Sequence, residues 1–140
     1  MNNICQKFKQ IIINNLEDIK NLKNKTIKKN DNSFVSEGDL LVQKLISEEI
    51  NKNHKNFFLI SEENDHLNKW QSYNDFIVLD PVDGTDNFIS GMKEWGVGIS
   101  VFKNKKHVES MIFLPDMNIT LKSGEKVEKN NSRIIGMSSR

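Results

Sequence analysis

Residues 76–88 read FIVLDPVDGTDNF, and the fold and the chemistry of the chain are best approached from this stretch. The apolar run at residues 76–79 predicts a buried strand that ends at Asp80. Two further acids, Asp83 and Asp86, follow within the next six residues. Carboxylates gathered at the end of a buried strand repel one another unless a cation lies among them. The stretch is therefore a candidate metal site.

The residues between these acids predict a tight turn into a short helix. Pro81 biases the residue before it towards extended backbone, and Gly84 permits a left-handed turn. Thr85 or Asp86 can then cap a helix through residues 87–90. Free N–H groups at the start of a helix favour an anion such as phosphate. A site for a hard cation would thus lie beside a site for a phosphate.

The donor set favours Mg²⁺ over Zn²⁺, because the stretch offers only oxygen ligands and no neighbouring His or Cys. Two metal ions that share Asp80 would clamp a phosphate ester and activate a water for in-line attack. A haloacid-dehalogenase-type phosphatase spaces its two Asp with one residue between them, whereas two residues separate Asp80 from Asp83. An EF-hand loop needs acids at alternate positions and a Glu at the twelfth, so it does not fit. A purely structural cluster of Asx turns remains an alternative.

Acids also occur at two places upstream. Ser36 and Asp39 fit a capping box at the start of a helix that ends near Asn53, so Asp39 has a structural explanation of its own. Glu62 and Glu63 follow a short apolar strand at residues 57–60. An adjacent pair of Glu after a strand is usually a solvated loop, and it gains interest here because a second strand also ends in acids.

The remaining pattern predicts helices packed on a mostly antiparallel sheet, an α+β domain. Residues 4–22 carry apolar side chains at three- and four-residue spacing and predict one amphipathic helix of about five turns. The basic tract at residues 23–32 is expected to be a loop or hairpin whose lysines are solvated. Further strands are expected at residues 33–35, 97–101, 108–114, 119–122 and 133–137, and the pair 97–101 and 108–114 should form a hairpin.

Composition excludes several classes of function. A net charge of +1 offers no field for nucleic acid or for an anionic membrane, so neither partner is expected. No apolar run approaches the length of about 20 residues that a membrane span needs. The single Cys5 cannot form an internal disulfide, and no signal peptide is evident, so we expect a cytoplasmic protein.

The motifs taken together resemble those of the inositol monophosphatase family of lithium-sensitive, Mg²⁺-dependent phosphatases, whose relatives include bisphosphate nucleotidases and fructose-1,6-bisphosphatases. The resemblance rests on the hexapeptide at residues 80–85 (DPVDGT), the Glu62-Glu63 pair upstream and Asp39 at a helix start. It covers the chain in order and implies the first half of a layered α-β-α-β-α fold. The implied function is Mg²⁺-dependent hydrolysis of a small phosphate monoester such as an inositol phosphate. The substrate could also be a 3′,5′-bisphosphonucleotide or fructose 1,6-bisphosphate.

The resemblance also implies roles for individual residues. The implied metal ligands are Glu62, Asp80, the Val82 carbonyl and Asp83. Glu62 and Thr85 would deprotonate and orient the attacking water, with Asp39 as an indirect partner of a weaker metal. The amides of Gly84 and Thr85 would hold the phosphate. Relatives commonly form homodimers, so the resemblance implies a homodimer as one possible assembly of this chain.

The chain departs from the family pattern in its later part. Family members are longer, and their second half supplies a Trp-Asp-x-Ala-Ala-Gly-like motif whose Asp completes the second metal site. Nothing in residues 86–140 matches that motif. We therefore interpret residues 1–140 as an N-terminal, metal-binding half of such a domain, truncated relative to the family. The alternative to an active phosphatase is an inactive metal- or phosphate-binding fragment.

Overall fold

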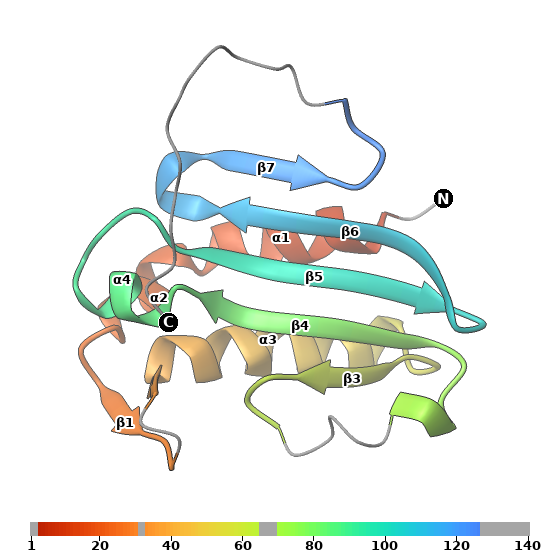
Figure 1. Cartoon of the computed structure of the whole chain (residues 1–140), viewed down its shortest axis with the longest axis horizontal. Coiled ribbons are helices and arrows are strands. Elements are labelled where there is room, and N and C mark those ends of the chain that lie inside the picture. The colour runs from red at the N-terminus through yellow and green to blue at the C-terminus, as the bar shows by residue number, and fades with distance from the viewer. Residues whose placement is uncertain (1–2, 31–32, 65–69, 127–140) are drawn as a thin grey trace.

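A five-stranded mixed sheet forms the centre of the molecule (Figure 1). The computed structural model describes residues 3–30, 33–64 and 70–126. The strands lie in the order of the chain, β3-β4-β5-β6-β7. Their bounds are Phe58–Ser61 for β3, Phe76–Asp83 for β4, Gly96–Lys103 for β5, Lys106–Leu114 for β6 and Ile119–Lys122 for β7.

Only one of the four strand pairings in this sheet is parallel. β3 runs parallel to β4, and β4–β5, β5–β6 and β6–β7 are antiparallel. The expected mostly antiparallel sheet is confirmed, as is the hairpin of β5 and β6. The expected end of the central strand at Asp80 is wrong, because β4 pairs with β5 as far as Asp83 across an irregularity in register between these two residues.

Helices cover one face of the sheet (Figure 1). The long helix α3, Glu37–Asn53, contacts β3 and β4, and helix α1, Ile4–Asn14, contacts β5 and β6. Alternate strand residues point towards the helices because successive side chains in a strand leave on opposite faces. The core between helices and sheet includes Phe8, Ile12, Val42, Ile46, Ile77, Leu79, Val97, Val101, Met111 and Phe113.

The N-terminal amphipathic segment is two helices rather than the single helix that its periodicity predicts. α1 ends at Asn14, and α2 spans Leu16–Asn21. Between them Asn15 has φ −115° and ψ 13°, outside helical geometry, and its side-chain amide donates to the Ile11 carbonyl at 2.8 Å. A side chain that bonds to the backbone in this way competes with the helix, which explains the break.

The basic tract after α2 forms a hairpin, as expected. β1, Thr26–Lys28, pairs antiparallel with β2, Phe34–Ser36. The second strand runs directly into α3, where the predicted capping box is present: the Ser36 side chain accepts from the Asp39 amide, and Asp39 accepts from the Ser36 amide.

The short helix α4, Thr85–Ile89, follows the central strand. Its start differs from the expected one, because the N-cap is Gly84 in the left-handed region, at φ 82°, and no side chain caps the helix. The short 3₁₀ helices η1, Trp70–Ser72, and η2, Pro115–Met117, precede β4 and β7. The strand expected at residues 133–137 lies outside the described residues. None of the helices in the described part of the chain has the length and apolarity that crossing a membrane requires.

The candidate functional site

The parallel pairing of β3 and β4 brings two of the predicted acids together. Ser61 is the register partner of Leu79, and the Glu62 amide donates to the Leu79 carbonyl at 3.3 Å. Glu62, which follows β3, and Asp80 of β4 therefore lie at adjacent positions on neighbouring strands. The start of α3 lies at the same edge of the sheet, because Asp39 accepts a hydrogen bond from Thr85, at the start of the helix that follows β4.

Thr85 joins the turn after β4 to α3. Its hydroxyl lies 3.0 Å from the Val82 carbonyl and 3.2 Å from Oδ1 of Asp39. The other oxygen of Asp39, Oδ2, accepts from the Ser36 amide at 2.9 Å and from the Ser36 hydroxyl. Asp39 is only 1% exposed. It is thus a helix cap and a neighbour of Thr85 at once, so the structural reading and the functional reading of this residue are compatible.

Asp80 is the acid with the least satisfied environment. Within the described residues, its Oδ1 is buried and has no hydrogen-bond partner. Burial, together with the negative charges of Glu62 and Asp83, raises the pKa of Asp80 to about 6. A buried carboxylate oxygen without a partner is costly, and a cation would relieve that cost.

The other acids of the central stretch are more exposed. Asp83 lies on the solvent side of β4, opposite Gly96. Asp86 is exposed in the first turn of α4 and is not among the charges that raise the pKa of Asp80. Glu62, Asp83, Asp39 and Glu63 therefore lie near enough to Asp80 for their charges to raise its pKa, whereas Asp86 lies outside this group.

The sequence did not predict the ion pair between Glu63 and Lys29 at this edge. Glu63, with 7% side-chain exposure, pairs with Lys29 at 2.6 Å, and Glu62 pairs with the same ammonium at 3.5 Å. The expectation that the lysines of the basic tract are solvated is wrong for Lys29, whose side chain is 24% exposed. No local pattern signals this contact, because Lys29 and Glu63 are 34 residues apart in the chain.

The predicted metal ligands fit a hard cation by their chemistry. The carboxylates and the Val82 carbonyl are oxygen donors, as Mg²⁺ prefers, and the buried Oδ1 of Asp80 lacks a partner in the described chain. Among the described residues, no three Asp, Glu, His or Cys side chains are grouped closely enough to hold a metal ion. The Glu62 side chain, 57% exposed, is paired with Lys29.

The turn before α4 is held against the start of β5. A Cβ on Gly84 would lie 3.1 Å from the Glu94 carbonyl oxygen and 3.6 Å from Cα of Trp95. The Asn87 side chain donates to the same Glu94 carbonyl at 2.7 Å. Both the positive φ of Gly84 and the close backbone favour glycine here, so a larger residue would strain the turn.

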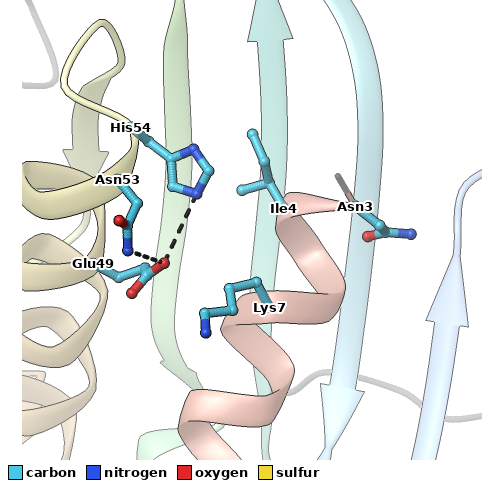
Figure 2. Close-up of a pocket in the computed structure, with 6 residues that line it drawn as sticks. All are labelled: Asn3, Ile4, Lys7, Glu49, Asn53 and His54. Carbon is cyan, nitrogen blue, oxygen red and sulfur yellow. Dashed lines mark hydrogen bonds and ion pairs between the residues drawn. The ribbon is translucent and has the colours of Figure 1, made fainter. Parts of the chain in front are cut away.

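A separate hollow of ≈ 510 Å³ lies at the opposite end of α3, away from the acids (Figure 2). Figure 2 shows that Glu49, Asn53 and His54 reach into it from the end of α3, while Ile4 and Lys7 face them from α1. Nε2 of His54 lies 3.9 Å from Glu49, and Asn53 donates to the same carboxylate at 2.9 Å. These groups bond to one another, and the hollow shares no residue with the acidic edge.

Comparison with known proteins supplies the family. A model of the inositol monophosphatase family matches residues 2–138. The chain belongs to the inositol monophosphatase family. The resemblance seen in the motifs is thereby confirmed, and it extends over nearly all of the sequence.

Two curated relatives illustrate the range of this family. The 3′(2′),5′-bisphosphate nucleotidase CysQ of Haemophilus influenzae is 32% identical over 94 residues, which cover 66% of this chain and 35% of that protein. The Nus factor SuhB of Escherichia coli is 28% identical over 114 residues, covering 80% of this chain and 42% of that protein. The chain spans less than half the length of these relatives.

Solved structures show the same fold. The Thermotoga maritima IMPase superposes with a TM-score of 0.73 at 19% identity, over 94% of this chain and 55% of that one. A staphylococcal inositol monophosphatase-1, in a LiCl-soaked inhibitory complex, gives 0.76 at 21% identity, over 86% and 45%. The expected α+β architecture is thereby confirmed as that of the family.

Proposed function

We propose that this chain carries the metal- and phosphate-binding part of a phosphate monoester hydrolase that uses two Mg²⁺ ions, with an inositol phosphate as substrate. The observation that carries the proposal is the buried, unpartnered Oδ1 of Asp80 among the described residues, beside the bond between Thr85 and Asp39. Membership of the family supports the reaction class. One related structure, a dual specific IMPase/NADP phosphatase, is bound with D-inositol-1-phosphate.

The proposed metal ligands are Glu62, Asp80, the Val82 carbonyl and Asp83. Mg²⁺ at these oxygens would neutralise charge on the phosphate and make a water easier to deprotonate. Glu62 is the proposed acceptor of that proton, because its carboxylate is exposed enough to meet a water. The amides of Gly84 and Thr85 are the proposed phosphate donors, at the start of the helix that Asn87 links to the Glu94 carbonyl.

Thr85 can orient the attacking water. Both partners of its hydroxyl, Asp39 Oδ1 and the Val82 carbonyl, are acceptors, so the single hydroxyl proton points to one of them. The lone pairs of the hydroxyl are then free to accept from a water. This arrangement gives Asp39 an indirect part in the reaction, in line with the role that the family resemblance implies.

A second candidate substrate is a 3′,5′-bisphosphonucleotide. CysQ of Haemophilus influenzae, at 32% identity, is a bisphosphate nucleotidase by name. Fructose 1,6-bisphosphate completes the set to be assayed. We place the protein in the cytoplasm as part of the same proposal, since its Cys5 is a free, buried thiol.

The test is Asp80→Asn, measured by Mg²⁺ calorimetry and by phosphate release from the three substrates. We expect wild-type protein to bind Mg²⁺ and the variant to lose binding and turnover, since the amide carries no charge to offset that of the cation. Asp75→Asn is the matched control, because it makes the same chemical change away from the acidic edge. Asp75 directly precedes the first residue of β4, and its Oδ1 accepts from the Asn104 backbone amide at 2.9 Å.

The outcomes separate the alternatives. Phosphate release that depends on Asp80 makes the chain an enzyme by itself. Mg²⁺ binding without turnover supports the fragment reading, in which the remaining length of the relatives supplies essential groups. Wild-type protein that binds no Mg²⁺, or Asp80→Asn with unchanged binding, contradicts the metal assignment.

A further inference from the structure

Lys29 reaches the acidic edge from the hairpin before α3. The hairpin is closed beside it by the bond from the Lys29 amide to the Ser33 carbonyl, at 2.8 Å. Its Nζ lies 2.6 Å from Oε1 of Glu63 and 3.5 Å from Oε1 of Glu62. The Glu63 side chain is 7% exposed and that of Lys29 is 24% exposed, so this ion pair is partly desolvated rather than a fully exposed surface contact.

The charges around Lys29 are strongly unbalanced. The negative charges of Glu62, Asp83, Asp39 and Glu63 all act on Asp80 to raise its pKa. Burial raises the pKa of Glu63 as well, and the nearby ammonium of Lys29 only partly offsets this. Burial opposes the charge on Lys29, yet its bond to Glu63 and the charge of Glu62 outweigh that, so the pKa of Lys29 lies above its ordinary value.

We propose that Lys29 is the resident counter-ion of this acidic edge and that it competes with a divalent cation for Glu62. The inference rests on the proposed function, because it takes Glu62 as a metal ligand. It accounts for two observations: no three Asp, Glu, His or Cys side chains of the described residues are grouped closely enough to hold a metal ion, and Glu62 is paired with the ammonium. Release of Glu62 from Lys29 frees its carboxylate to join Asp80.

The competition has a sign and a size. An ammonium and a divalent cation that bind the same carboxylate repel each other, and charges of +1 and +2 about 8 Å apart repel by about 1 kcal/mol at the dielectric constant of water, which is about fivefold in a binding constant. Removal of the ammonium should therefore tighten Mg²⁺ binding about three- to tenfold. The metal-free protein should become less stable, because Glu63 would lose its partner in a buried position.

The experiment compares Lys29→Met with Lys25→Met. Lys25 lies on the same hairpin segment and pairs with Glu37 at 3.4 Å, but both side chains are largely exposed and neither belongs to the acidic edge. We expect Lys29→Met to lower the Mg²⁺ dissociation constant measured by calorimetry and to lower the melting temperature in EDTA. Lys25→Met should change neither, and Lys29→Arg should bind Mg²⁺ less tightly than Lys29→Met.

A measurement on the wild-type protein does not depend on how the variants fold. Labelling by an amine-reactive ester, followed by peptide mass spectrometry, should be faster at Lys29 with saturating Mg²⁺ than in EDTA, while the rate at Lys25 stays constant. If wild-type protein binds Mg²⁺ but Lys29 labels equally in both conditions, or Lys29→Met binds no tighter, the competition is refuted and the proposed function stands. If wild-type protein binds no Mg²⁺, both fail together.

Discussion

At the scale of single residues, the two oxygens of Asp39 explain how one side chain serves both stability and the candidate site. Oδ2 is occupied by the amide and hydroxyl of Ser36, and Oδ1 is left for the Thr85 hydroxyl. A carboxylate can accept several bonds, so neither task excludes the other. Because the cap fixes the side chain, Thr85 meets an acceptor that is already in position.

Asp116 has a comparable structural role in η2. Its carboxylate accepts from the Trp95 indole at 2.8 Å and pairs with Lys20 at 2.7 Å. Burial favours the neutral acid, but the bonds from Lys20 and Trp95 outweigh it, so the pKa of Asp116 lies below its ordinary value. The charged form therefore ties α2 and η2 to the start of β5.

This pairing predicts a pH dependence. A carboxyl group with a lowered pKa in the folded state stabilises the fold above its ordinary pKa, about 3.8, and loses that contribution as the pH falls. Asp116→Asn should therefore melt at a lower temperature than wild type at pH 7, and the difference should shrink towards pH 3. Melting curves of both proteins across this range check it; a constant difference would show that charge is not the cause.

At the scale of elements, the turn into α4 contains a glycine whose surroundings leave little room for a side chain. Gly84 and Gly124 both have φ +82°, but a Cβ on Gly84 would meet the Glu94 carbonyl, whereas one on Gly124 has nothing within 4 Å. The pair thus separates the cost of backbone conformation from the cost of crowding.

Alanine at each position is the corresponding test. Gly124→Ala should cost about 1 kcal/mol for the left-handed backbone alone. Gly84→Ala should cost more, because the neighbouring backbone must shift by a few tenths of an ångström, and it should also weaken phosphate binding. Chemical denaturation measures the first effect and calorimetry with inorganic phosphate the second. Equal costs would mean that the turn is not clamped.

Most elements were predictable because their signals are local. Alternating or continuous apolar runs marked the strands, and the capping box at Ser36 marked the start of α3. The break at Asn15 was not predictable from periodicity, since a single side-chain bond decides it. In the candidate site, the proximity of Glu62 and Asp80 was predictable because two strands end in acids. The contact with Lys29 was not, because it depends on tertiary packing between distant parts of the chain.

At the scale of the whole molecule, the two faces of the sheet differ. Met111 points into the helix-covered core and is 1% exposed, while its neighbour Ile112 lies on the opposite face and is 47% exposed. Leu121, the register partner of Ile112, is exposed on the same open face. Val78 is also exposed there, aligned through Ser100 with Ser110, which lies two residues before Ile112. Within the described residues, one side of the sheet is therefore a core and the other is open.

Adjacent substitutions on β6 test this asymmetry. Met111→Ala should cost about 2–5 kcal/mol of unfolding free energy, as for other buried large-to-small changes, and Ile112→Ala well under half of that. Urea denaturation of both variants measures the difference. If Ile112→Ala proves as costly as Met111→Ala, the open face is covered in solution.

The placement of the two tryptophans gives the molecule a built-in optical reporter. Trp95 is 1% exposed, packs against Phe88 of α4 with ring centroids 4.7 Å apart and ring planes tilted by 59°, and lies beside the Gly84 turn. Trp70 is 41% exposed and contacts Phe76, at the opposite end of β4. A water-soluble quencher such as acrylamide extinguishes the emission of an exposed indole before that of a buried one. The fluorescence that survives comes from Trp95, so its wavelength and intensity follow the phosphate turn without any label.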